Sequence, residues 1–125
     1  MNNVYGYPAA VWVRFSAGTH AGRLQGAEVV SVQAGTVAGK SLLALDAQVE
    51  QGRIADARFL AYGCPVTVAV GDWVAEQLRG AEVAALHSPR YQAASIRAAL
   101  EIPDDRAHCA LMGEDLVRHL AEAVK

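Results

Sequence analysis

Cysteine is scarce in this chain, which holds two cysteines, Cys64 and Cys109, among its 125 residues. Two cysteines are too few for the disulfide framework of a small secreted domain, so we expect reduced thiols that are either buried or reactive. Net charge is also small: a formal charge of -2 with 19% charged residues gives no electrostatic footprint for nucleic acid or an anionic membrane. We therefore expect no nucleic-acid or membrane partner.

Long apolar runs and common enzyme motifs are missing as well. No stretch approaches the roughly 20 apolar residues of a membrane span, and residues 1–4 lack the basic region of a signal peptide. These absences predict a cytoplasmic protein. The P-loop, the dinucleotide fingerprint and the Gly-x-Ser-x-Gly elbow are absent, and Asp104 and Asp105 form no acid–base pair. None of these familiar motifs therefore identifies an enzymatic reaction.

The chain length suits one domain, which we place over residues 1–125. Its first part, residues 1–23, is the least informative. Residues 11–15 are compatible with either a short helix or a short strand that packs on the core, and residues 17–22 are expected to form a glycine-containing loop.

Three strands are predicted from apolar residues that alternate with polar ones. Residues 28–34 form the first strand, and residues 43–49 form the second, which shows the clearest alternation. A short turn at residues 50–52 leads to a third strand that begins near Arg53 and runs towards Gly63. Short connections between consecutive strands predict an antiparallel meander with one wet face and one covered face.

Helices are predicted to cover one face of this sheet. Apolar residues recur at three- and four-residue spacing from Val66 to Leu78, before Gly80, and residues 82–86 are expected to add a short helical turn. Ser88 and Pro89 predict the start of a helix that ends before Pro103, and a last helix is expected from His108 or Cys109 onward. Strands followed by helices predict an α+β fold, a three-stranded antiparallel sheet with helices packed on one face.

The residues with the most chemical interest are Cys64, Cys109 and His108. Each cysteine lies at a predicted helix N-terminus, where backbone amides favour a thiolate over a thiol. If the two helices converge at one end of the sheet, two thiolates and an imidazole form a cluster suited to zinc, iron or an iron-sulfur centre. Two plainer interpretations remain open: two small buried core cysteines, and a hydrogen-bonded structural histidine.

Other polar residues give weaker signals. His20 is expected in a loop, and His87 and His119 are expected to be exposed. Asp56 and Arg58 share the polar face of the third strand and are expected to pair there.

Two segments carry a resemblance to a known family. Residues 52–64, which end in Tyr-Gly-Cys before a helix, and residues 102–109, which end in His-Cys and precede Gly113-Glu114-Asp115, resemble the IscU/NifU N-terminal iron-sulfur scaffold family. The resemblance runs from about Leu42 to the C-terminus, with a weaker echo at residues 20–22. It implies a three-stranded sheet with helices on one face, and a protein that receives sulfur from a cysteine desulfurase, assembles a [2Fe-2S] cluster on three cysteines and transfers it to apoproteins.

The sequence departs from that family in two places. The loop that carries the first family cysteine and an aspartate is here residues 36–41, which contain neither and include Lys40. Residues 102–106 also replace the Leu-Pro-Pro-Val-Lys motif by which many bacterial scaffolds recruit a dedicated chaperone. Cys64, His108 and Cys109 thus supply three donors, and a fourth has to come from water, glutathione, a second protomer or a partner.

Three hypotheses follow. The first is a degenerate scaffold-family member, not an enzyme, that acts in cluster assembly or transfer and binds iron, sulfur or a [2Fe-2S] cluster at Cys64, Cys109 and His108, with zinc as an alternative in the purified protein. A cysteine desulfurase and apo iron-sulfur proteins are its expected partners, and a homodimer remains open. The second is an adaptor of the iron-sulfur pathway that kept the fold without metal chemistry. The third is a thiol switch in which the two cysteines form a reversible disulfide.

Overall fold

The computed structural model describes residues 5–124, which form four α-helices, three strands and three short 3-10 helices. In chain order they are α1 (Ala9–Ala17), β1 (Val29–Thr36), β2 (Ser41–Glu50), β3 (Arg53–Tyr62), α2 (Pro65–Leu78), η1 (Val83–Ala85), η2 (Pro89–Tyr91), α3 (Ala93–Leu100), η3 (Asp104–Arg106) and α4 (Ala107–Ala123). The α+β class and the order of strands before most helices are as predicted. Within residues 5–124, no helix is long and apolar enough to cross a membrane.

The sheet is an antiparallel meander in the order β1-β2-β3. Val29 pairs with Gln48 at one end of the β1–β2 ladder, and Leu42 pairs with Tyr62 at the end of the β2–β3 ladder that leads into α2. The β2–β3 turn uses Gln51 and Gly52, both with positive φ (52° and 77°), as a two-residue hairpin of the primed type requires. The predicted meander is therefore confirmed.

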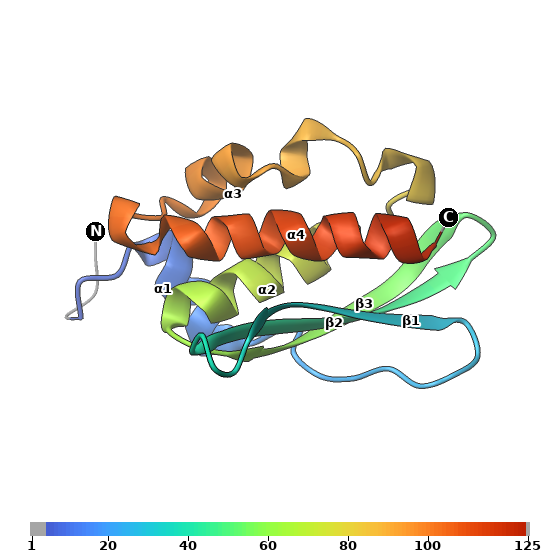
Figure 1. Ribbon diagram of the computed structural model, residues 1–125, viewed down its shortest axis with the longest axis horizontal. Helices are drawn as coiled ribbons and strands as arrows, with labels where there is room; N and C mark the ends of the chain where they lie inside the picture. The colour runs from blue at the N-terminus through green and yellow to red at the C-terminus, as the bar shows by residue number, and fades with distance from the viewer. Residues whose placement is uncertain (1–4, 125) are drawn as a thin grey trace.

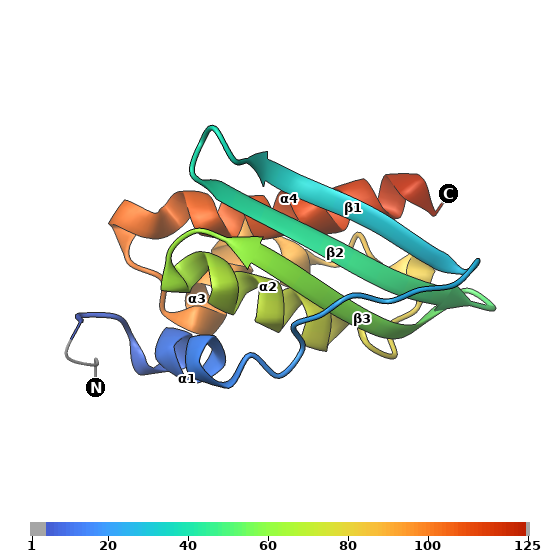
Figure 2. The ribbon, with the colours of Figure 1, turned by 90° about the horizontal axis from the view of Figure 1, so that it is seen from below.

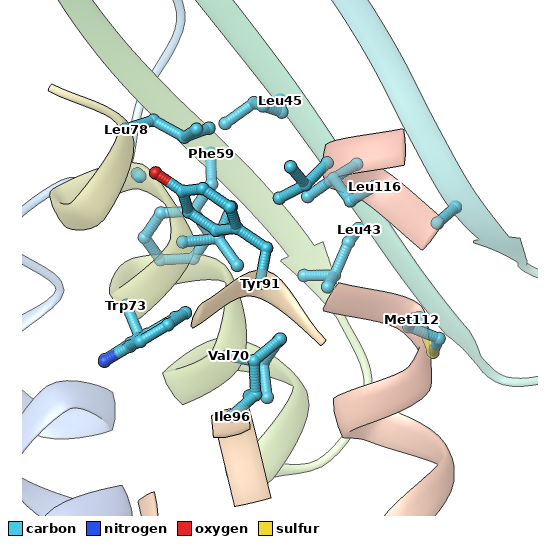
Figure 3. Packing of buried hydrophobic residues seen from close by; sticks show 14 of the residues in the cluster. Leu43, Leu45, Phe59, Val70, Trp73, Leu78, Tyr91, Ile96, Met112 and Leu116 are labelled. Atoms are coloured by element: carbon cyan, nitrogen blue, oxygen red, sulfur yellow. The ribbon is translucent and has the colours of Figure 1, made fainter. Parts of the chain in front are cut away.

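Helices α2 and α4 lie side by side on one face of the sheet, with α3 outside them (Figure 1). The core fills the space between these layers, and Figure 3 shows apolar side chains from both layers pointing towards one another, among them Leu43, Phe59, Val70, Ile96 and Leu116. This face is the covered one that the alternation predicts.

Two glycines set how closely the helices approach. A Cβ added to Gly71 of α2 would lie 2.5 Å from Cδ2 of Phe59, and one added to Gly113 of α4 would lie 2.7 Å from Cγ1 of Val70. Such distances are far below van der Waals contact, so only glycine lets α2 seat on β3 and α4 seat on α2. The close approach of α2 and α4 brings their first turns, with the two cysteines, to the same end of the molecule (Figure 1).

The opposite face of the sheet is less wet than expected. The segment between α1 and β1 passes over it (Figure 2). Asp46 on this face is 2% exposed and contacts that segment. The Asp46 carboxylate accepts hydrogen bonds from Arg23 Nε at 2.7 Å, from Leu24 N at 3.0 Å and from Ser31 Oγ at 2.7 Å. Asp46 lies on the face that the alternation predicts to be wet, but it is buried because the segment between α1 and β1 packs over it. The alternation within the strands did not reveal the position of this segment.

Several local predictions are refined. The ambiguous residues 11–15 are helical, within α1, and residues 82–86 contain η1, as expected. The helix predicted from Ser88 is wrong at its start, because only the 3-10 turn η2 forms there and Gln92 is extended (ψ 151°). Helix α3 begins at Ala93, whose N–H donates to Glu114 Oε1 of α4 at 2.8 Å. A contact distant in sequence therefore sets this boundary.

The three remaining histidines differ in their surroundings. His20 lies in a loop, as predicted, but its side chain is 8% exposed. His87 is exposed, also as predicted. His119 was expected to be exposed, but it is half-buried and its Nδ1 lies 2.8 Å from the carbonyl oxygen of Gln33 on β1. Packing of α4 against β1 accounts for this difference.

Candidate functional site

Cys64 occupies the N-cap position of α2, with extended backbone angles (φ -77°, ψ 170°) and Pro65 at the first helical position. The preceding Gly63 has φ 149°, and a Cβ there would lie 2.8 Å from Thr67 Oγ1. Glycine thus permits both the sharp turn out of β3 and the close packing against Thr67. The chain places the Cys64 sulfur beside the free amides of the first helical turn, as predicted.

Cys109 lies in the first turn of α4, which begins at Ala107. Its side chain is fully buried, whereas Cys64 is half-buried, and neither is in a disulfide. The two cysteines therefore differ in accessibility: Cys64, at the helix cap, is partly exposed and Cys109 is not.

The two sulfurs meet at one hydroxyl. Thr67 Oγ1 lies 3.7 Å from Cys64 Sγ and 3.4 Å from Cys109 Sγ. Cys109 Sγ lies in turn 3.5 Å from Nε2 of the exposed His108. These contacts make a continuous polar chain from an exposed imidazole, through a buried thiol and a buried hydroxyl, to a half-buried sulfur. The structure thus brings together all three residues that the sequence singled out.

Cys64 is the more acidic of the two thiols. A hydrogen bond from the Cys109 thiol, supported by the Thr67 backbone amide, the Thr67 hydroxyl and the Val66 amide, outweighs burial and lowers the pKa of Cys64 to about 4. The same interaction, together with burial, raises the pKa of Cys109 well above the ordinary thiol value. At neutral pH the site holds one thiolate, on Cys64, and one thiol, on Cys109.

Arg106 adds positive charge to the site. A hydrogen bond with Tyr7 and the negative charge of Cys64 raise the pKa of Arg106. Its Nε is buried and, among the residues that the structure describes, lacks a hydrogen-bond partner, while Nη1 lies 3.8 Å from Asp105 Oδ2. This cation lies where it stabilises an anionic sulfur.

Sequence reasoning missed Thr67 and Arg106 as site residues. Both carried a signal: Thr67 follows Cys64 by one helical turn, and Arg106 precedes Cys109 by three residues. Both residues join the site only because α2 packs against α4, and spacing along the sequence does not reveal that packing.

The residues present do not form a finished metal centre. Over residues 5–124, no group of three or more His, Cys, Asp or Glu side chains is arranged to hold a metal ion. Thr36 Oγ1 accepts a hydrogen bond from Gly39 N at 2.9 Å and closes the β1–β2 turn, where Lys40 is exposed. The ligand set Cys64, His108 and Cys109 therefore remains a prediction.

The other charged residues of interest are engaged away from the cysteines. Asp56 and Arg58 pair at 3.7 Å, as expected, and Asp56 also pairs with Arg79 at 3.1 Å. Asp104 pairs with Arg97 at 2.5 Å.

Comparisons with known proteins agree with the resemblance. The family model for the NifU-like N terminal domain matches residues 6–125. An iron-sulfur cluster assembly protein IscU of Plasmodium falciparum is 28% identical over 78 residues, which cover 62% of this chain and 47% of that protein. The scaffold protein IscU of Buchnera aphidicola is 33% identical over 69 residues, which cover 55% and 52%. The chain spans about half the length of the curated relatives it matches.

Solved structures share the fold. A NifU-like protein (N-terminal part) of Brucella abortus superposes with a TM-score of 0.67 at 15% identity, and the superposition covers 94% of this chain and 90% of the Brucella chain. A protein described as a cluster assembly scaffold for the SUF system of Fervidobacterium islandicum superposes with a TM-score of 0.73 at 14% identity, covering 95% and 96%. These likenesses confirm the arrangement of sheet and helices.

Proposed function

Since the chain belongs to the NifU-like N-terminal domain family of iron-sulfur cluster assembly scaffolds, we propose that it acts in cluster assembly or transfer and carries iron, sulfur or a [2Fe-2S] cluster as cargo. The observation that carries this proposal is the convergence of the Cys64 and Cys109 sulfurs on Thr67 Oγ1, at 3.7 and 3.4 Å. His108, 3.5 Å from Cys109 Sγ, is the third donor. Thiolate and imidazole are the ligands that iron-sulfur centres and zinc prefer.

The cargo is held transiently in this proposal. Three donors from one chain leave a metal one ligand short, so water, glutathione, a second protomer or a partner completes the site. The charge of Arg106 beside Cys64 favours an anionic sulfur species over a bare cation. A cysteine desulfurase is the proposed sulfur source and apo iron-sulfur proteins are the proposed recipients. The protein carries and transfers cargo in the cytoplasm without acting as an enzyme, as a single domain over residues 1–125.

Anaerobic reconstitution with iron and sulfide, in parallel with zinc titration, tests this proposal. Visible absorbance and metal per chain are measured in the wild type, Cys64→Ser, Cys109→Ser and His108→Asn, with His87→Asn as a control at an exposed histidine. We expect binding that requires both cysteines and survives His87→Asn. No binding by the wild type under either condition would contradict the cargo function.

A second candidate function is an adaptor that binds a partner of the iron-sulfur pathway without metal. It is favoured by two exposed apolar side chains that flank the cysteines in sequence, Tyr62 (52% exposed) and Leu111 (50% exposed). Pull-down with a purified cysteine desulfurase separates the two functions. The adaptor predicts binding that survives Cys64→Ser and Cys109→Ser but is lost in Tyr62→Ser with Leu111→Ser.

A further inference from the structure

The two cysteines have the arrangement of an attacking and a resolving thiol. Cys64 is partly exposed at the helix cap, whereas Cys109 is fully buried. Both sulfurs contact the same hydroxyl, Thr67 Oγ1. A sulfur donor can therefore reach Cys64 first, and Cys109 is already beside the product of that reaction.

We infer that this pair does more than hold sulfur: it accepts a sulfane sulfur on Cys64 from a persulfide donor and releases it as sulfide by forming a Cys64–Cys109 disulfide. The inference rests on the proposed function and names its sulfur substrate, a persulfide of the form R–S–SH. It follows from the count of thiols as well as from geometry. One chain holds two cysteines, and two thiols supply the two electrons that reduce one sulfane sulfur.

In the first step the Cys64 sulfur attacks the outer sulfur of the donor. A bond forms between Cys64 Sγ and that sulfur, the S–S bond of the donor breaks, and R–S⁻ leaves. In the second step Cys109 Sγ attacks Cys64 Sγ, so that the Cys64–Cys109 bond forms, the bond to the outer sulfur breaks and HS⁻ leaves. The two cysteine sulfurs are oxidised to a disulfide, the sulfane sulfur is reduced to sulfide, and an external dithiol reductant restores the pair.

The proton of the Cys109 thiol has a defined route out. His108 Nε2, 3.5 Å from Cys109 Sγ, accepts it as Cys109 attacks, and the exposed imidazole passes it to solvent. The Thr67 hydroxyl, within hydrogen-bonding distance of both sulfurs, holds them on the same side of α2 while the second bond forms. Sulfide leaves from Cys64, the accessible side of the pair.

A single-turnover experiment tests the inference. Reduced wild-type protein is mixed anaerobically with glutathione persulfide, and sulfide and intact protein mass are followed over time. We expect one sulfide per chain and a protein about 2 Da lighter, the mass of an internal disulfide. Cys109→Ser, and Cys109→Ala as a second variant at this buried position, should stop at a protein about 32 Da heavier, the persulfide on Cys64, with no sulfide release beyond buffer.

Histidine variants test the proton route. His108→Asn should slow sulfide release by about tenfold or more without slowing the first step, because general-base assistance acts on the attack by Cys109. His87→Asn should match the wild type, since His87 is exposed and outside the polar chain.

The other outcomes overturn the inference. A wild-type persulfide that persists on Cys64 without sulfide release would show that sulfur binds but Cys109 does not resolve it, and the cargo function would stand. Equal sulfide release by the wild type and both Cys109 variants, or glutathionylated protein in place of the internal disulfide, would assign the reduction to glutathione. An unmodified wild type would overturn the inference as well, and reconstitution with iron and sulfide would then decide the cargo function separately.

Discussion

Helix α2 carries two buried polar clusters that differ in how completely their atoms are paired. Towards α1, the Asp72 carboxylate is 2% exposed and accepts hydrogen bonds from Arg14 Nη1 and from the His20 backbone amide, each at 2.9 Å. At the first turn of α2, Thr67 contacts two sulfurs at 3.4 and 3.7 Å, and one of the two cysteines, Cys64, is partly exposed. The first cluster has short contacts between charged or strongly polar groups; the second has long contacts to sulfur.

The difference separates a structural cluster from a chemical one. Short charge-assisted hydrogen bonds satisfy Asp72 and hold α1 and the following loop against α2. Sulfur forms weak hydrogen bonds, so the cysteine cluster contributes little to stability and leaves a nucleophile available. Substitutions in the two clusters should therefore change different properties of the protein.

The largest effect is expected for thiol labelling. Cys64→Ser should reduce alkylation of the native protein by iodoacetamide by about a hundredfold or more, because the remaining thiol, Cys109, is buried and reacts only after local opening. The free energy of unfolding, measured by urea titration, should change by less than about 0.5 kcal/mol. Labelling that persists in Cys64→Ser and disappears in Cys109→Ser would reverse the assignment of the accessible thiol.

Asp72→Ala is expected to lower stability and to leave thiol labelling unchanged. Loss of the buried carboxylate should lower the free energy of unfolding by about 2–3 kcal/mol, since the His20 amide and Arg14 lose a charged acceptor. Alkylation of Cys64 should stay at the wild-type rate. Glu76→Gln is the matched control, because Glu76 also pairs with Arg14 but is 44% exposed, and it should cost less than about 1 kcal/mol.

A third prediction extends the comparison to Asp46. Burial alone would raise its pKa, but Arg23, the Ser31 hydroxyl and the Leu24 amide outweigh burial and hold the pKa of Asp46 below its usual value. The unfolded state therefore binds the proton more readily, and this contribution to stability is lost as pH falls below about 5. Urea titrations across acidic pH should show a flatter dependence in Asp46→Asn. An equal slope in both proteins would contradict the role of Asp46.

The smallest effect is expected for Thr67→Val, which keeps the shape of the side chain and removes the hydroxyl. The Thr67 hydroxyl is one of several causes of the low pKa of Cys64, so its loss should raise that pKa and slow alkylation several-fold at mildly acidic pH. In the wild type, alkylation should decline only as pH approaches about 4, when the thiolate takes up a proton. Identical pH profiles for wild type and variant would exclude a role for the hydroxyl.

Much of the fold was predictable because its signals are local. Alternation in β2 and the three- and four-residue spacing in α2 identified these elements, and the Tyr-Gly-Cys sequence placed Cys64 at a helix start. The start of α3 was not predictable. Ser88 and Pro89 are typical of a helix N-terminus, but only a 3-10 turn forms there and α3 begins at Ala93. The Glu114 carboxylate that accepts the hydrogen bond from the Ala93 amide lies on another helix, α4. No local sequence pattern indicates this contact.

By itself, the sequence determined the chemistry that is available: two thiols, each at a helix N-terminus, and an imidazole next to one of them. Only the tertiary structure decided which thiol is accessible, which residues join the pair and which carboxylates are buried. The reason is that acidity and burial depend on groups brought close through space. Gly71 and Gly113 let α2 and α4 pack tightly, and this packing places Thr67 between Cys64 and Cys109.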